Sequence, residues 1–473
     1  MINVDHDISA ADLAPAIETM WNLSAAKILA IDAAFPPGSP TPVVTREGLY
    51  QPQGWTEWTQ GFQHGSAVLQ FDATGDERFL DLARRRTRET MASHVTHVGV
   101  HDHGFNNVST YGNLLRVALA GRCDATPGEL DFYRMALMAS GAVQAARWAS
   151  RRDPGRPGAG YIYSFNGPQS LFVDTIRSGR SLVLAHLLGH ALMGEQDEKI
   201  SLYGRFVEHA RSTAEFNIYY GEGRDIYDLR GRTCHEALFN AKNGDFRAPS
   251  TQQGYSPFST WTRGLAWAIC GFAEQLECLP LIDDADLEPH GGRDAVAGFM
   301  IRAARATADF YIERSPTCGV PYWDTGAPGL VHMGDVNARP AEPFNDHEPV
   351  DSSAAAIAAQ GLLRLGSGGF VDRSDADRYT QAGLTIARTL LSDAYTSRDP
   401  DHQGLLLHTV YHRPRGWDHI PEGRAIPCGE SCMWGDYHLR ELALMIQRAA
   451  EGATIPAFFH AAVPDGFRAG GAS

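Results

Sequence analysis

The sequence has no long hydrophobic run. No stretch approaches the roughly 20 apolar residues that a membrane-spanning helix needs. The first residues, Met1-Ile-Asn-Val-Asp-His-Asp, contain neither the basic segment nor the apolar core of a signal peptide. We therefore expect no membrane partner and a cytoplasmic location, or a periplasmic one if a signal was removed.

Paired cysteines are also lacking. The seven cysteines are odd in number and irregularly spaced, and Cys428 and Cys432 have no second pair that would complete a zinc site. This usage is typical of free, buried thiols in a reducing compartment.

Basic residues are scarce. The chain has 41 basic and 56 acidic residues, and its net charge is −15. An acidic chain without a basic stripe repels polyanions, which excludes nonspecific binding to nucleic acid. A small anionic ligand remains compatible with this charge where a pocket supplies local positive potential. The apolar content of 43% and the charged content of 21% are ordinary, and we expect one globular domain over residues 1–473.

A loose repeat runs through the chain. A helix rich in Ala, Gly and Leu is followed by a turn and then by a longer, more charged helix. The expected pairs are Gly61–Phe71 with Glu77–His94, Val108–Gly121 with Pro127–Arg147, Ser178–Met193 with Asp197–Phe216, Thr260–Leu279 with Arg293–Arg314, and Ser352–Leu365 with Ser374–Leu391. Single helices are expected at 11–34 and 436–450. Twelve helices in such pairs predict an all-α toroid of six hairpins, closed if the terminal helices pair. Strand signals are sparse, at 319–323 and 405–410.

The loops before the small-residue helices are rich in aromatic and titratable side chains. They contain Trp55 and Trp58, His101-Asp102-His103, Asp174, His235 with Gln252-Gln253 and Trp261-Thr-Arg263, His347 with Asp351, and Trp434 with Asp436. In an up-down ring all six loops lie at one end, together with six helix N-termini that favour an anion. The sequence therefore predicts a single binding cavity at that end.

Each of these residues also has a purely structural interpretation. Asp102, Asp174, Asp351 and Asp436 stand where helix N-caps belong. The tryptophans, Trp267 included, could simply fill the core. His101-x-His103 with Asp102 lacks a third ligand at a recognised spacing, so a metal site is not favoured.

The motifs resemble the unsaturated glucuronyl hydrolases of glycoside hydrolase family 88 and, more distantly, the unsaturated rhamnogalacturonyl hydrolases. The matching segments are Trp58-Thr-Gln-Gly-Phe62, His101-Asp102-x-Gly104-Phe105, Asp174-Thr175, Gln253-Gly-Tyr-Ser256, Ser259-Thr-Trp261-x-Arg263-Gly264-x-Ala266-Trp267, Val320-Pro-Tyr-Trp-Asp324, Asp351-Ser-Ser-Ala-Ala-Ala356 and Trp434-Gly-Asp-Tyr437. They run in order over most of the chain.

The resemblance implies an (α/α)6 barrel that releases an unsaturated uronic acid from the non-reducing end of oligosaccharides made by polysaccharide lyases. It implies no metal and no organic cofactor. Asp174 would be the general acid/base, protonating C4 and directing water onto C5. Asp102 would be the second carboxylate, whose charge is expected to raise the pKa of Asp174. The substrate-binding residues would be Trp58, His101, His235, Gln253, Trp261, Arg263 and Trp267.

The chain departs from the family pattern beside these motifs. Gln63-His64 replaces Trp-Pro, Ile176-Arg177-Ser178 follows Asp174-Thr175, and His103 replaces a small or aliphatic residue. We expect these positions to border the sugar subsite. Two other hypotheses stay open: a glycosidase of the same fold that acts on a saturated or modified uronide, and a non-catalytic glycan-binding protein.

Overall fold

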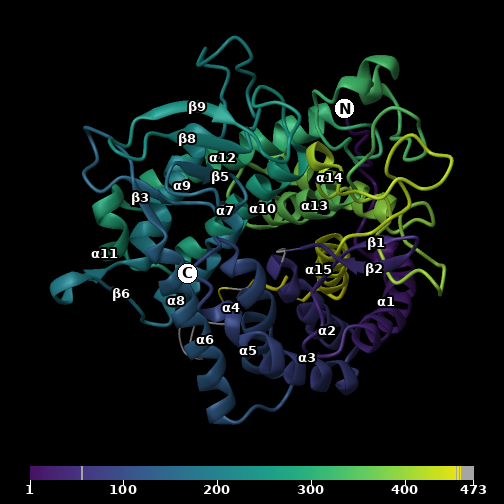
Figure 1. Ribbon diagram of the computed structural model, residues 1–473, viewed down its shortest axis with the longest axis horizontal. Coiled ribbons are helices and arrows are strands. Elements are labelled where there is room, and N and C mark those ends of the chain that lie inside the picture. The colour runs from purple at the N-terminus through teal and green to yellow at the C-terminus, as the bar shows by residue number, and fades with distance from the viewer. Residues whose placement is uncertain (55–56, 454, 458, 460–473) are drawn as a thin grey trace.

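Figure 1 shows the computed structural model, which describes residues 1–54, 57–453, 455–457 and 459. Its centre is a ring of largely buried helices that contact one another in sequence order and then close back on the first. These inner helices are α2 (Gln60–Thr74), η3 (Gly104–Gly112) continued by α5 (Asn113–Leu119), α7 (Thr175–Ser178) with α8 (Arg180–Leu187), α10 (Thr262–Cys278), α13 (Ser352–Ser367) and α15 (Met433–Ala450).

An outer layer of helices covers this ring. Each outer helix packs on the inner helix that is its neighbour in sequence. The outer helices are α1 (Ala14–Ala34), α3 (Glu77–Thr90), α6 (Pro127–Ala146), α9 (Leu202–Phe216), α12 (Gly292–Arg314) and α14 (Arg373–Leu390). The predicted (α/α)6 barrel is confirmed.

The ring is closed by its terminal helices, as the repeat predicted. Trp21 of α1 donates a 3.0 Å hydrogen bond to Gln447 of α15, and Arg440 of α15 donates one of 2.8 Å to Ser24 of α1. In Figure 1 the yellow α15 accordingly lies next to the purple α1 and α2.

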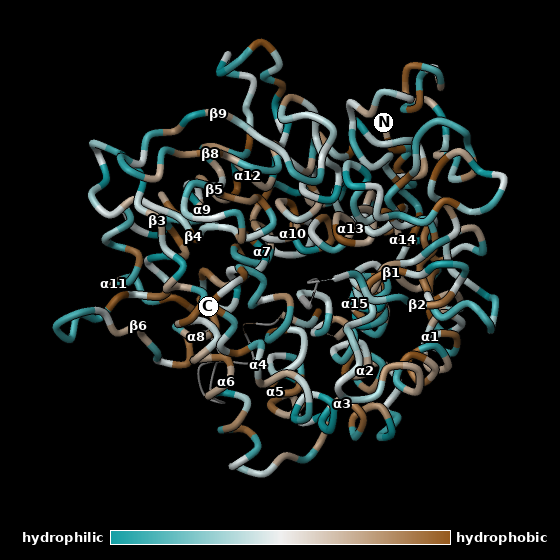
Figure 2. The backbone as a smooth tube through the Cα atoms, in the orientation of Figure 1, coloured by the Kyte–Doolittle hydropathy of each residue, from teal (hydrophilic) through white to brown (hydrophobic). Residues whose placement is uncertain are grey.

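Composition explains which helices lie inside. The start of α13, Ser352–Ala359, is buried along its whole length because small side chains let neighbouring backbones approach closely. Outer helices keep one polar face, and α3 is capped by Asp76, whose carboxylate accepts from the Arg78 amide. Figure 2 shows hydrophilic residues in the projecting loops, for example the turn after β6 (Leu192–Met193). No helix among the described residues has the length and apolarity needed to cross a bilayer.

Some predicted boundaries are wrong. The helix predicted over 178–193 is broken at Gly179 and ends at Leu187, and the chain then forms the hairpin of β6 with β7 (Lys199–Ile200). The helix predicted from Val108 begins at Gly104, as a π-helical stretch. The segment 405–410 is not a strand and forms one isolated bridge, Thr396 with Leu406.

Short strands that the sequence analysis missed lie in the segments between the helices. They are β1 (Pro42–Arg46) with β2 (Leu49–Pro52), β3 (Trp148–Ser150) with β4 (Gly160–Ile162), and the antiparallel sheet β5–β8–β9 (Ser170–Phe172, Glu236–Phe239, Phe246–Ser250). The last sheet matters for function because it brings segments on either side of the third hairpin together.

Candidate active site

The two candidate catalytic aspartates come from different hairpins. Asp102 lies in the loop that enters η3, and Asp174 follows β5 and begins α7. The two segments touch, because a Cβ on Gly104 would lie 2.1 Å from the carbonyl oxygen of Ser178. Only glycine permits this approach, which sets the loop of Asp102 against the turn of Asp174.

A histidine lies between the two carboxylates. His101 Nε2 is 3.2 Å from Asp174 Oδ1 and 3.8 Å from Asp102 Oδ1, and all three side chains are largely buried. The structure therefore brings together the two aspartates that the sequence singled out, around one imidazole nitrogen.

The pKa shifts of these groups run in opposite directions. Burial raises the pKa of Asp102, and this outweighs the opposing effect of His101. Burial also raises the pKa of Asp174, but the hydrogen bond and charge of His101, together with smaller effects of His235 and Arg263, outweigh burial, so the net pKa of Asp174 is lowered. The predicted rise for Asp174 is wrong because it counted the charge of Asp102 and omitted His101.

The helix-capping interpretation applies to some of the aspartates only. Asp351 caps α13, accepting from the amides of Ser353 and Ala354. Asp174 occupies the N-cap position of α7 but its side chain accepts no capping hydrogen bond. Asp102 precedes the N-cap residue of η3, and Asp436 lies inside α15. Asp102 and Asp174 are therefore not explained by helix capping.

A cavity of about 670 Å³ opens over the two aspartates. Its lining includes all the predicted site residues except His235. The lining residues are Trp58, His97, Val100, His101, Asp102, Phe105, Phe165, Asp174, Gln252, Gln253, Trp261, Arg263, Trp267, Tyr411, His412 and Trp417. The predicted convergence of loops at one mouth is thus present.

Aromatic rings form the cavity walls. Trp58 stacks on Trp434 with ring centroids 4.9 Å apart, and Phe105 packs on Trp267, also at 4.9 Å. Trp434 is fully buried, so Trp58 lines the cavity while Trp434 packs in the core against it. Trp55, named with them in the sequence analysis, lies outside the described residues. Aromatic faces of this kind suit the C–H faces of a sugar ring.

Arg263 is buried and fully engaged. It pairs with Asp351 at 2.6 Å, donates to Gln253 Oε1 at 3.0 Å and donates to the carbonyl of Tyr411 at 2.7 Å. Its guanidinium therefore fixes two segments of the wall, and its charge also contributes to lowering the pKa of Asp174. The local positive potential that an anionic ligand requires is present here.

His235 is buried next to the lining residue Trp261, with ring centroids 4.7 Å apart. Its Nδ1 accepts from the amides of Gln252 and Gln253 at 3.0 and 3.2 Å, which assigns the proton to Nε2. Burial lowers the pKa of His235 to about 4, so the ring is neutral near pH 7. Pairing of β5 with β8 holds it near Asp174, since the Val173 amide donates to the His235 carbonyl.

Six lining residues were missed by the sequence analysis: His97, Val100, Phe165, Tyr411, His412 and Trp417. Tyr411, His412 and Trp417 come from the long loop between α14 and α15, where the amides of Tyr411 and His412 donate to the carboxylate of Asp418. The density of aromatic residues in Tyr411–Trp417 was the available signal, but the segment matched no motif and precedes α15 by many residues.

The positions that depart from the family pattern do not border the cavity, which corrects the expectation stated above. Gln63 and His64 line a separate cavity between α1, α2, α3 and α15. His103 is hydrogen-bonded to Ser140 and to the carbonyl of His97 and is not among the residues that line the cavity.

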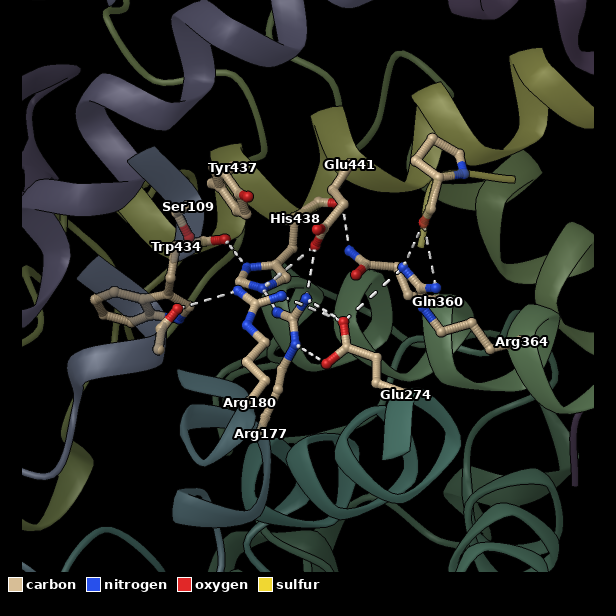
Figure 3. A network of polar contacts seen from close by, with 12 residues as sticks. Ser109, Arg177, Arg180, Glu274, Gln360, Arg364, Trp434, Tyr437, His438 and Glu441 are labelled. Carbon is tan, nitrogen blue, oxygen red and sulfur yellow. Dashed lines mark hydrogen bonds and ion pairs between the residues drawn. The ribbon is translucent and has the colours of Figure 1, made fainter. Parts of the chain in front are cut away.

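Arg177 and Ser178 lie beneath the site floor. Figure 3 shows Arg177 and Arg180 pointing toward Glu274 and Glu441 in a fully buried network that also contains His438, Gln360 and Arg364. Ser178 Oγ donates to the carbonyl of His101 and accepts from the Gly104 amide. These residues are absent from the cavity lining and support the site from outside it.

No family model matches the chain. Among curated proteins, the chain is 29% identical to the unsaturated glucuronyl hydrolase of Bacillus sp. strain GL1, over 84% of this chain and 88% of that protein. It is 25% identical to the unsaturated chondroitin disaccharide hydrolase of Streptococcus pyogenes serotype M1, over 86% and 84%. The crystal structure of the Bacillus sp. GL1 enzyme superposes with a TM-score of 0.65 over 94% of this chain and 98% of that one, at 24% identity.

Proposed function

Because the chain belongs to the unsaturated glucuronyl hydrolase family, we propose that it hydrates the C4–C5 double bond of a 4-deoxy-hex-4-enuronosyl residue. The residue would stand at the non-reducing end of a lyase-generated oligosaccharide. Water addition at C5 gives a hemiketal, which opens and releases the remaining sugar. The observation that carries the proposal is the convergence of Asp102, Asp174 and His101 at the floor of an aromatic cavity.

Each type of side chain in the cavity would have its own role in the reaction. Asp174 would give a proton to C4 and take one from the water that attacks C5, and this dual role needs a carboxyl that can hold and release a proton. Asp102, whose pKa is raised, would bind hydroxyls and hold negative charge close to the reacting carbons. Trp58, Trp261 and Trp267 would stack on the sugar faces.

The uronate carboxylate would face the positive side of the cavity. Arg263 supplies the charge there, and the Nε2 of His235 is buried without a partner among the described residues. A buried N–H lacking an acceptor costs free energy, which an anionic ligand oxygen would recover. Gln253, held by Arg263, would add a directional hydrogen bond.

The test is turnover of unsaturated disaccharides from several lyases, followed as loss of the ultraviolet absorbance of the conjugated enol ether. Saturated uronides of the same linkage are the matched control. We expect loss of absorbance with at least one unsaturated substrate and no release of sugar from its saturated counterpart. Cleavage of the saturated substrate alone would overturn the proposal in favour of a hydrolase with paired carboxylates. Binding without turnover would indicate a glycan-binding protein.

A further inference from the structure

His101 is held in place by hydrogen bonds to its backbone and by aromatic rings packed against its side chain. Its carbonyl accepts from Gln144 Nε2 at 2.6 Å and from Ser178 Oγ. The rings of Phe165 and Phe172 pack against the imidazole, with centroids 5.7 and 5.5 Å away. The side chain is 2% exposed, so the ring cannot turn away without disturbing the core.

The two ring nitrogens of His101 differ in their surroundings. Nε2 lies within hydrogen-bond distance of Asp174 and 3.8 Å from Asp102. Nδ1 is buried and has no hydrogen-bond partner among the described residues. Within the protein, protons therefore enter or leave this imidazole on the side of the two aspartates.

We infer that His101 is a positioning residue that stores the proton of the reaction and shares it with Asp174 across the Nε2–Oδ1 hydrogen bond. This inference rests on the proposed function and assigns to His101 a role beyond substrate binding.

The step balances without a cofactor. The stored proton passes from His101 Nε2 to Asp174 Oδ1 and from there to C4. The π electrons of the C4–C5 bond form the new C4–H bond, and water forms the new C5–O bond. The surplus proton of that water returns to Asp174 and is shared again with His101. No atom is oxidised or reduced, and the pair ends as it began.

Electrostatics agree with this geometry. Burial lowers the pKa of His101, but the charge of Asp102 and the hydrogen bond to Asp174 outweigh it, so the net pKa is raised. The pKa of Asp174 is lowered. With Asp174 alone, the acid form that must protonate C4 would be scarce near neutral pH. The imidazolium keeps a proton within one hydrogen bond of the carboxylate.

Charged and titratable groups approach His101 from several elements. They are Asp102 from its own loop, Asp174 from the N-cap of α7, Arg147 from just after α6, His209 from α9 and His235 from just before β8. Arg147 opposes protonation of His101 and the two aspartates favour it. His209 and His235 have pKa values lowered to about 3 and 4, so they stay neutral and do not compete for the proton near pH 7.

The test compares His101→Gln with the wild type. Glutamine can still donate one N–H to Asp174 but cannot hold a second proton. Loss of the His101 proton sets the basic limb of the kcat–pH profile in wild type, so this limb should move at least about one pH unit lower in His101→Gln, with about a tenfold loss of kcat on that limb. His103→Gln is the control, because His103 is buried in the same loop but faces Ser140 and His97. It should keep the wild-type limb whatever its effect on the maximal rate.

A titration that needs no turnover separates this inference from the proposed function. Imidazole nuclear magnetic resonance should show one histidine titrating above the ordinary value of 6.5. That signal should disappear in His101→Gln and titrate at lower pH in Asp174→Asn. An unshifted basic limb in His101→Gln, or no such signal, overturns the inference. A wild type that titrates as expected but hydrates no unsaturated substrate overturns the proposed function alone.

Discussion

The guanidinium of Arg263 and the carboxylate of Asp351 form a 2.6 Å ion pair that is almost completely buried. Asp351 also caps α13, and Arg263 reaches Gln253 and the carbonyl of Tyr411. One ion pair therefore ties an inner helix to two segments of the cavity wall.

Asp351→Asn should destabilise the protein by about 3–5 kcal/mol, because it leaves the Arg263 charge buried without its anion. Asparagine is as good an N-cap as aspartate, so the loss isolates the ion pair. Urea unfolding monitored by circular dichroism measures it. Asp76→Asn, at the exposed cap of α3, is the control and should change stability by less than about 1 kcal/mol. A similar small change for Asp351→Asn would contradict the prediction.

Asp174→Asn should lower kcat by about 10²- to 10⁴-fold, the usual contribution of a general acid/base. Asp102→Asn should cost less in kcat, because its carboxylate binds the substrate and tunes its neighbour. Absorbance assays at saturating unsaturated disaccharide measure both. Each variant should unfold within a few degrees of wild type. An Asp174→Asn protein that keeps a tenth of the wild-type kcat would rule out this role.

The network beneath the site floor should control stability more than chemistry. Glu274 accepts from Arg177 and Arg180 and is 1% exposed (Figure 3). Glu274→Gln should cost about 3 kcal/mol or more, because two buried guanidinium groups lose their common anion. Asp377→Asn breaks the highly exposed pair with Arg373 and should change stability by less than about 0.5 kcal/mol. Equal losses of stability in Glu274→Gln and Asp377→Asn would show that burial does not increase the contribution of these ion pairs to stability, which would contradict the prediction.

Acid should destabilise the protein through buried histidines. Burial lowers the pKa to about 3 or 4 in His64, His94, His103, His209, His235, His408 and His412. Below pH 6.5 these histidines become protonated in the unfolded chain but stay neutral in the folded chain. The free energy of unfolding therefore falls with pH until the pKa values of the folded state are reached. Each group contributes on the order of a few kcal/mol. The urea concentration at the midpoint of unfolding, measured at pH 7, 6 and 5, should fall steeply as the pH is lowered.

The variant His209→Gln tests whether a buried neutral histidine contributes to this loss of stability in acid. His209 accepts from the Ile162 amide, a role that a glutamine oxygen can take over. The variant should lose less stability than wild type between pH 6.5 and 4. A variant whose stability falls as fast as that of wild type would exclude His209 as a contributor.

The fold could be predicted because the same pattern of two helices is repeated along the sequence. Small-residue helices such as α13 alternate with amphipathic ones such as α3, and six copies of one pattern outweigh errors in any copy. Predicted helix boundaries were wrong where a local feature of the backbone interrupts the pattern. Gly179 breaks the third inner helix, and the π-helical turn at Gly104 lets that chain begin its helix four residues early.

The site was predictable where a residue lies directly before an inner helix. Asp102, Asp174, Trp261 and Arg263 follow this rule and line the cavity. Tyr411, His412 and Trp417 break it, since their loop crosses the mouth well before α15 begins. The charge state of Asp174 was mispredicted because it depends on the distance to His101, which sequence spacing does not give.

Closure of the ring by α1 and α15 has a consequence for biosynthesis. While the chain emerges from the ribosome, α1 and α2 lack the helix that covers them until residues 433–450 have been made. Contacts across such a sequence separation form late and slowly. A chain truncated before α15 would therefore persist as an open arc with apolar edges, a natural substrate for chaperones and a source of aggregation.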